Sequence, residues 1–296
     1  MPVVMITGCS NGLGLALAKL LAATGRFRLV VTARSTSLPK LKTLFTESDT
    51  LMIRELDLQK PHNFKSLFNE ISYRWGGVDL LVNNAAVIYR AVLEHVSISD
   101  EQMQIQTNYL GPRELIRLAL PYMRHKKHGK IINISSVSGM MAMPTMSSYS
   151  ASKWALEGMS EALWYELKPF NISVSLVQIG FVNSNSFKNT ISPKDTIISD
   201  NELYEAYYTA MSGFVDKMMR STLATPEKIS QTILKQIIDH RSPSLRIAGT
   251  LDAHFFGLMR RFLPQRIYHF ILYYSLPSSI RIEIKKFMKM IDRLDK

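Results

Sequence analysis

Short apolar segments rich in β-branched residues alternate with longer amphipathic segments along most of this 296-residue chain. The short segments predict strands at residues 3–7, 29–32, 50–56, 78–82, 130–135 and 172–179. The longer segments predict helices at residues 13–23, 38–45, 64–75, 102–123 and 151–167. Continuously apolar strands separated by helices are typical of a parallel sheet covered on both faces. The pattern therefore predicts an α/β fold with a doubly wound parallel sheet, a Rossmann fold.

The alternation breaks after the sixth predicted strand. Residues 183–222 combine a polar loop with an aromatic-rich helix, and residues 226–240 then predict a helix before a last strand at 245–248. No repeat or low-complexity linker divides the chain. We expect one domain over residues 1–250 with an inserted substrate lid at about 183–222. Residues 251–296 are expected to form a basic, apolar, helical C-terminal tail.

Bulk composition narrows the class of protein. The chain is 46% apolar and 20% charged, which is ordinary for a globular protein with a large core. Its one cysteine, Cys9, excludes a disulfide framework and a multi-cysteine metal site, so we predict no metal and a reducing, cytoplasmic compartment. The first residues lack a basic segment followed by an apolar one, so we expect neither a signal peptide nor an N-terminal anchor.

The net charge of +12 is unevenly distributed. Residues 254–296 hold nine basic and three acidic side chains, so half of the excess lies in the tail. A second basic cluster at residues 124–130 falls between a predicted helix and a predicted strand, where a solvated loop is the simpler interpretation. We recognise no nucleic-acid-binding module and expect no nucleic-acid partner.

Three glycines follow the first predicted strand and open the first helix. They are Gly8, Gly12 and Gly14, in the segment Thr-Gly-Cys-Ser-Asn-Gly-Leu-Gly. Glycine allows positive φ and close backbone approach, and a helix N-terminus attracts phosphate. In this strand-to-helix context the glycines predict a pyrophosphate site for a dinucleotide.

The end of the second predicted strand carries the evidence for cofactor choice. An NAD-binding protein normally offers a carboxylate here to the ribose hydroxyls, whereas this chain has Ala33 and Arg34. Alanine removes the repulsion of a 2′-phosphate, and arginine can pair with it through charge-assisted hydrogen bonds. The pair predicts NADP(H), although a surface arginine after a strand is the simpler alternative.

Tyr149 and Lys153 lie four residues apart, with Ser136 thirteen residues before the tyrosine. On a helix this spacing places both side chains on one face. A neighbouring cation favours the phenolate, so we expect Lys153 to lower the pKa of Tyr149 toward the range useful for proton transfer. The pair alone is common by chance, so its weight depends on the other motifs.

Taken together, the glycine segment at 7–14, the Asn-Asn-Ala-Ala segment at 83–86, Asn108, Ser136 and the Tyr-Ser-Ala-Ser-Lys segment at 149–153 resemble the compact branch of the short-chain dehydrogenases/reductases. The resemblance covers roughly residues 3–250, and its style is similar to retinol and hydroxysteroid dehydrogenases. It implies NADP(H) contacts from Gly8, Ser10, Asn11, Gly12, Leu13, Gly14, Arg34, Asp57, Leu58, Asn84, Ala85, Ala86, Tyr149, Lys153, Gly180 and Val182. It also implies a homodimer or homotetramer.

The resemblance also implies catalytic roles. Ser136 would bond the substrate oxygen, and Tyr149 would exchange its proton. Lys153 would lower the phenol pKa and hold the nicotinamide ribose, and Asn108 would position a water, although an asparagine within a helix often only repairs a kink. The spacing of the family pattern selects Ser136 over Ser135 and Ser138.

One departure from the family pattern follows the sixth strand. Where the family commonly has Pro-Gly, this chain has Ile179 and Gly180. Asn183 and Ser184 stand where family members often carry a threonine for the nicotinamide amide.

Methionines and aromatic residues dominate the segments expected around the substrate. They are Met140, Met141, Met143, Met146, Phe181, Phe187, Tyr204, Tyr207, Tyr208, Met211 and Phe214. Such side chains suit a bulky, flexible, hydrophobic ligand such as a steroid, a retinoid or a long-chain carbonyl compound. Packing of the lid on the domain explains any single one of them equally well.

The tail mixes apolar and aromatic residues with arginines and is too interrupted to span a bilayer. Three interpretations stay open: peripheral contact of residues 251–296 with an anionic membrane on its cytoplasmic face, a cover over the pocket, and a subunit contact. The leading functional hypothesis is an NADP(H)-dependent reductase or dehydrogenase acting on a small hydrophobic substrate. Its rivals are a catalytically silent NADP(H)-binding regulatory protein and a membrane-attached interaction protein.

Overall fold

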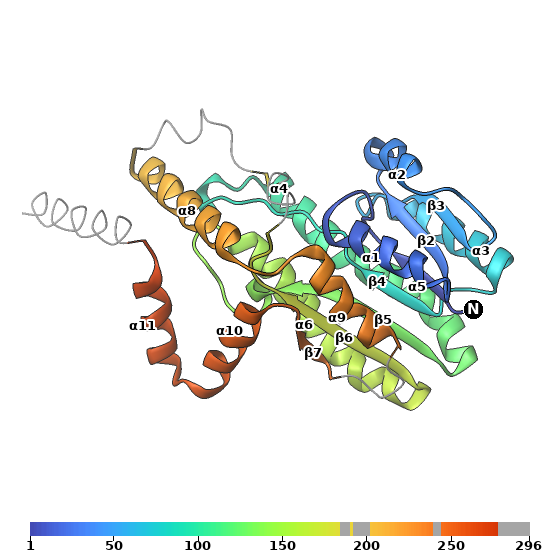
Figure 1. The fold of residues 1–296 in the computed structure, drawn as a ribbon. Helices are drawn as coiled ribbons and strands as arrows, with labels where there is room; N and C mark the ends of the chain where they lie inside the picture. The colour runs from blue at the N-terminus through green and yellow to red at the C-terminus, as the bar shows by residue number, and fades with distance from the viewer. Residues whose placement is uncertain (184–189, 192–201, 239–243, 278–296) are drawn as a thin grey trace, which may run out of the picture.

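A parallel sheet of seven strands forms the centre of the molecule (Figure 1). The computed structural model describes residues 1–183, 190–191, 202–238 and 244–277. The strands are β1 (Val3–Ile6), β2 (Arg28–Ala33), β3 (Leu51–Glu55), β4 (Leu80–Asn83), β5 (Gly129–Ser136), β6 (Ile172–Ile179) and β7 (Arg246–Ala248). Their order is β3-β2-β1-β4-β5-β6-β7, and every pair is parallel. The predicted doubly wound fold and its strands are confirmed.

Helices cover both faces of this sheet. One face carries α1 (Gly12–Thr24), α2 (Leu38–Leu44) and α9 (Pro226–Ile238), and the other carries α3 (Phe64–Trp75), α5 (Gly111–Lys126) and α6 (Ser147–Leu167). An apolar cluster lies on each face of the sheet, and alternate residues of β1 point into the two clusters. Val4 and Ile6 belong to the cluster under α1, α2 and α9, and Val3 and Met5 belong to the cluster under α3, α5 and α6. This alternation explains why the central strands are apolar without interruption.

The predicted helix at residues 102–123 is wrong as one continuous α-helix. Helix α4 (Ile98–Ile105) begins at Ser97, whose hydroxyl accepts from the Asp100 N–H at 3.1 Å. A π-helical turn then runs over Gln106–Leu110 before α5 starts at Gly111. Pro112 cannot donate an N–H to the carbonyl four residues earlier, which removes one bond of an α-helical ladder. The widened turn holds Asn108.

The C-terminal part adds helices α8 (Glu202–Ser221), α10 (Leu251–Phe262) and α11 (Gln265–Ser275). In Figure 1, α8 lies beyond the end of α9, and α10 and α11 continue the chain away from the sheet. A third apolar cluster joins Ala253 and Tyr268 to Val137, Met140 and Met141. The predicted lid is described at residues 183, 190–191 and in α8, and the rest of its polar loop lies outside the described residues.

Candidate active site

The turn between β1 and α1 forms a narrow backbone cradle. Gly8 has a φ of 73°, which favours glycine. The Thr7 hydroxyl accepts from the N–H groups of Asn84 and Ala85, both at 2.9 Å, and the Asn84 amide donates to the carbonyls of Thr7 at 2.8 Å and Gly8 at 3.1 Å. A Cβ on Gly14 would lie 2.2 Å from the Gly8 carbonyl oxygen. The cradle therefore depends on glycine and faces the positive end of α1.

The carboxyl ends of β2 and β3 border the same cavity. Ala33 is buried at the end of β2, and the exposed Arg34 follows it directly. Asp57 and Leu58 come just after β3, where the Asp57 carboxylate accepts from the Gln59 N–H at 3.1 Å. A guanidinium in this place, with no carboxylate at the end of β2, suits an anionic group on a ribose.

A single cavity of about 630 Å³ runs along the carboxyl edge of the sheet. Of the sequence-predicted residues, its lining includes Gly8, Ser10, Asn11, Leu13, Gly14, Arg34, Asp57, Leu58, Asn84, Ala85, Ala86, Ser136, Tyr149, Lys153, Gly180 and Val182. Gly12 and Asn108 are not part of this lining. The volume and the glycine cradle fit a dinucleotide with its pyrophosphate at the start of α1.

Ser136, Tyr149 and Lys153 meet in the middle of this cavity. Strand β5 ends at Ser136, and α6 carries the other two side chains. The Ser136 hydroxyl accepts from the Ser138 N–H at 3.1 Å and also bonds with Tyr149. Ser135 instead donates to Glu157 at 2.7 Å. The Ser135 hydroxyl is therefore engaged by Glu157, whereas the Ser136 hydroxyl contacts the Tyr149 phenol.

Burial controls the ionisation of this pair. It raises the pKa of Tyr149 to about 12, with a smaller lowering by the bond from Ser136. Burial also lowers the pKa of Lys153 to about 8, partly offset by the Glu157 carboxylate. The ammonium donates to the Ile134 carbonyl at 3.0 Å and lies 5.8 Å from the centre of the Tyr149 ring. Burial therefore raises the phenol pKa, against the expected lowering, and Lys153 is not among the groups that lower it.

Asn108 links two elements of the site from outside the cavity. Its side chain accepts from the Val87 N–H at 2.9 Å and donates to the Val87 carbonyl at 2.9 Å. The same amide donates to the Ser152 hydroxyl at 3.0 Å, which in turn donates to the Tyr149 carbonyl at 2.7 Å. Asn108 thus ties the loop after β4 to the turn of α6 that bears Tyr149.

The apolar end of the cavity uses only some of the predicted side chains. Met143, Met146 and Phe181 line it. Met140 and Met141 do not line it, and they pack in the cluster with α10 and α11. Phe187 lies outside the described residues.

The lid tyrosines also differ from the prediction. Tyr208 accepts from the Val92 N–H at 3.0 Å, and Tyr204 donates to Glu94 at 2.7 Å. These two side chains fasten α8 to the loop after β4, and Tyr207, Met211 and Phe214 are likewise absent from the described lining.

Several lining residues were not predicted. Val215 and Met219 of α8, Met103 and Thr107, and Pro226 and Ile229 of α9 border the cavity. The spacing of four between Val215 and Met219 is the one signal that could have revealed a helix face. Arg90 also lines the cavity, where it approaches the Thr145 hydroxyl at 3.5 Å, and burial lowers the pKa of its guanidinium. Among the described residues, the substrate end is therefore lined mainly by apolar side chains together with the Arg90 guanidinium.

Metal sites and membrane-spanning helices are two further features that would indicate other classes of protein. Among the described residues, no group of three or more His, Cys, Asp or Glu side chains is arranged to hold a metal ion. Within the same residues, no helix combines the length and the apolar character that crossing a bilayer requires.

The open parallel sheet, the glycine cradle and the buried Tyr–Lys pair together define a nicotinamide-dependent oxidoreductase. A family model described as short chain dehydrogenase matches residues 2–195. The chain belongs to the short-chain dehydrogenase/reductase family, whose members act on CH–OH and C=O groups.

Three curated relatives illustrate its place in the family. Dehydrogenase/reductase SDR family member 7B of Xenopus tropicalis is 33% identical over 259 residues, covering 83% of this chain and 77% of the relative. Retinol dehydrogenase 8 of Bos taurus is 32% identical, with coverages of 83% and 81%. The 3-ketodihydrosphingosine reductase of Bacteroides thetaiotaomicron is 31% identical, with coverages of 91% and 96%.

Solved structures agree with this placement. A short-chain dehydrogenase from Streptomyces avermitilis superposes with a TM-score of 0.75 at 27% identity, covering 98% of this chain and 97% of the other. A metagenomic short-chain oxidoreductase in complex with NADP has a TM-score of 0.64 at 25% identity, with coverages of 83% and 96%.

Proposed function

We propose that this protein is an NADP(H)-dependent oxidoreductase that interconverts a hydrophobic carbonyl compound and its alcohol. The observation that carries the proposal is the continuity of one cavity. It joins the glycine cradle and Arg34 to Tyr149 and Lys153, and then to an apolar end lined by Met143, Met146 and Phe181.

Bound nicotinamide supplies or accepts the hydride. The chain supplies the proton chemistry. With a pKa of about 12, Tyr149 keeps its proton at neutral pH and can donate it to a carbonyl oxygen. Ser136 contacts the phenol and is placed to bond the same oxygen. Lys153 is cationic below its pKa of about 8 and stabilises negative charge that develops on that oxygen or on the phenol. Asn108 holds α6 against the loop after β4.

For the cofactor, we infer a preference for NADP(H) over NAD(H). Arg34 borders the cavity beside Ala33, so its guanidinium can pair with a 2′-phosphate, and nothing at the end of β2 repels that phosphate. The NADP-bound relative supports this choice.

For the substrate, we infer a bulky hydrophobic compound in the class of retinoids, steroids and long-chain ketones or aldehydes. Methionine side chains adapt to flexible apolar ligands, and two of them line the cavity. The relatives named for retinol and for 3-ketodihydrosphingosine support this class.

The experiment is a screen of retinaldehydes, ketosteroids and long-chain ketones and aldehydes for NADPH oxidation, followed by Tyr149→Phe with the best substrate. Loss of the proton donor is expected to lower kcat by about 10²- to 10⁴-fold, because general acid catalysis typically contributes that much. The dissociation constant for NADPH should change little. Unchanged turnover in Tyr149→Phe would contradict the mechanism, and a substrate found only among sugars would contradict the class.

We further propose that α10 and α11 contact an anionic membrane surface. Leu251, Phe255, Leu258 and Phe262 form an exposed stripe along α10, and Ile267, Phe270, Ile271 and Tyr274 form another along α11. Arg261 and Arg266 are exposed beside them. Apolar faces flanked by cations suit the interface of an anionic bilayer. The alternative is a homodimer or homotetramer in which a second subunit covers the same stripes.

A further inference from the structure

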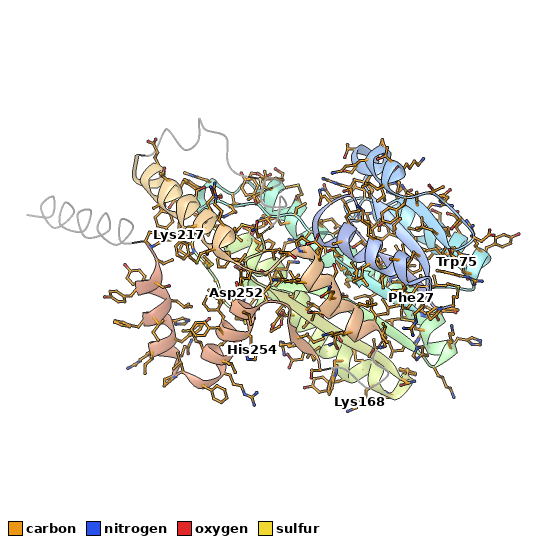
Figure 2. The ribbon with its side chains drawn as sticks, viewed as in Figure 1. Phe27, Trp75, Lys168, Lys217, Asp252 and His254 are labelled. Carbon is orange, nitrogen blue, oxygen red and sulfur yellow. The ribbon has the colours of Figure 1, made fainter. Side chains whose placement is uncertain are left out.

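Two side chains at the start of α10 bind the loop that follows β6. The Asp252 carboxylate accepts from the Phe181 N–H at 2.7 Å, and the Thr250 hydroxyl accepts from the Gly180 N–H at 2.9 Å. Gly180, Phe181 and Val182 line the cavity together with Tyr149 and Lys153. Figure 2 labels Asp252 at the start of α10, and its side chain is partly buried. The tail therefore reaches the active-site edge through its first turn.

Gly180 is glycine because of this contact. Its φ is not in the left-handed region, so the backbone conformation alone does not require glycine. A Cβ at this position would lie 1.9 Å from one carboxylate oxygen of Asp252 and 2.3 Å from the carboxyl carbon. The family resemblance implies that Gly180 contacts the cofactor, and the structure shows that its missing side chain also makes room for Asp252.

The other end of α10 is fastened to the second active-site loop. The Arg260 guanidinium donates to the Met140 carbonyl and lies 4.6 Å above the Trp154 ring. Met140 also packs with Ala253 and Tyr268. Residues 137–140 follow Ser136 directly, so α10 bridges the loop after β5 and the loop after β6. Both loops line the cavity together with Tyr149.

We propose that Asp252 is a positioning residue that fixes the loop 180–182 against the nicotinamide side of the cavity. The inference rests on the proposed function in one respect, namely that a nicotinamide lies beside this loop. The carboxylate makes a charge-assisted bond to a backbone N–H, which is stronger than a neutral bond. Without it, the loop can shift relative to Tyr149, and displacements on the order of 1 Å are costly for hydride and proton transfer.

A purely structural role has different consequences. An aspartate in the first turn of any helix interacts favourably with the helix dipole. Thr250 already caps α10, accepting from the Ala253 N–H at 3.4 Å. If Asp252 only stabilised α10, its removal would lower thermal stability and leave kcat unchanged. Glu227 provides the matched control, because it is an exposed acidic residue in the first turn of α9.

The first test compares Asp252→Ala, Asp252→Asn and Glu227→Ala in the full chain. We expect Asp252→Ala to lower kcat by about 10- to 100-fold. The dissociation constant for 2′,5′-ADP, which lacks the nicotinamide, should stay within about threefold, since the cradle and Arg34 are untouched. Asp252→Asn retains an oxygen that accepts from Phe181 and should recover most of the turnover. A kcat for Asp252→Ala near that of the wild type, or an equal loss in Glu227→Ala, would overturn the proposal.

A double-mutant cycle with Gly180→Ala tests the contact itself. In the wild-type background the added methyl group meets the carboxylate, so kcat should fall by at least about 10-fold. In the Asp252→Ala background the three atoms nearest to the added methyl group are gone, and Gly180→Ala should cost no more than about twofold further. Equal losses in both backgrounds would refute the contact.

The emission of bound NADPH, which reports the nicotinamide surroundings, is measured for the four proteins of this cycle and for Asp252→Asn. Because this emission needs only bound NADPH, the effect of each substitution can be measured even when no substrate is known. The emission is expected to change in Asp252→Ala and to be restored in Asp252→Asn. A wild type that binds NADPH but turns over no carbonyl compound would contradict the proposed function alone, and unchanged emission in Asp252→Ala would contradict the positioning role alone.

Discussion

The two ends of the cavity are built in different ways. The cofactor end consists of backbone and small side chains: Thr7, Gly8 and Asn84 are joined by hydrogen bonds between adjacent strand ends. Gly14 lies so close to Gly8 and Asn84 that no Cβ fits between them. The substrate end consists of bulky side chains from α8 and the loops after β4, β5 and β6, braced by α10. The first end tolerates almost no added atom, whereas the second is made of adaptable side chains. The difference teaches that backbone geometry shapes the dinucleotide cradle, whereas side-chain packing shapes the substrate end.

Among the variants considered, Gly14→Ala is expected to have the largest effect, a loss of NADPH affinity at the cofactor end. The added Cβ would lie 2.2 Å from the Gly8 carbonyl and 2.4 Å from the Asn84 amide nitrogen, so the cradle must move. We expect NADPH affinity to fall by about 100-fold or more, because several charge-assisted phosphate bonds share this turn. Isothermal titration calorimetry measures the loss.

Gly158→Ala is the matched control, since a Cβ there meets no atom within 4 Å. Alanine favours a helix interior over glycine, so this variant should bind NADPH normally and melt slightly higher. Equal affinities for the two variants would show that the cradle is not rigid.

The pH dependence of activity tests the role of the Lys153 ammonium, which lies between the cofactor end and the substrate end. Burial lowers the pKa of Lys153 to about 8, so its ammonium is present below pH 8 and is lost above it. Tyr149, with a pKa of about 12, keeps its proton throughout. We expect kcat/KM for NADPH in carbonyl reduction to be constant below pH 8 and to fall above it by about tenfold per pH unit. A profile that stays flat to pH 10 would contradict the role of the ammonium.

The preference for NADPH over NADH depends on one side chain of the cofactor end, Arg34. Arg34→Ala removes the guanidinium beside the ribose position, and we expect NADPH to bind about 10-fold more weakly because one charge-assisted interaction is lost. NADH, which lacks the 2′-phosphate, should bind as before. Quenching of tryptophan fluorescence measures both constants, and Arg26→Ala, an exposed arginine before β2, is the control. A parallel loss for both cofactors would argue against 2′-phosphate recognition.

The smallest expected effect concerns the exposed stripes of the tail. Truncation at residue 250 would also remove Asp252, Ala253 and Tyr268, so point changes are the cleaner test. The variant Phe262→Ser with Phe270→Ser should reduce flotation with phosphatidylserine-containing vesicles by about three- to tenfold, because two exposed aromatic rings that would enter the membrane interface are lost. Turnover of a water-soluble substrate should be unchanged.

Tyr73→Ser, an exposed aromatic residue on α3, is the control for the vesicle experiment. Equal flotation of all three proteins would favour a subunit contact, which sedimentation of the double variant would reveal as a smaller assembly.

Sequence reasoning was accurate where function depends on local order along the chain. The glycine turn must follow β1 and precede α1, and Tyr149 and Lys153 must share a helix face; both conditions can be read from spacing. The predicted fold followed from alternating apolar segments, because the central strands are buried on both faces. The exception was the helix over residues 102–123, where Pro112 and the π-helical turn place Asn108 in a widened turn.

Other properties depend on contacts between distant residues. Spacing could not show that burial raises the pKa of Tyr149, because desolvation depends on everything packed around the phenol. Nor could it show that Met140 packs with Tyr268 away from the cavity, or that Gly180 makes room for Asp252, 72 positions later in the numbering.

The sequence by itself determined the doubly wound fold and the positions of the glycine turn, Arg34, Ser136, Tyr149 and Lys153, because these depend on period and spacing. Only the tertiary structure decided the ionisation of the Tyr–Lys pair, the lining of the substrate end and the bracing of the loop after β6 by α10. Each of these arises from side chains that are distant in the chain and meet only in the folded protein.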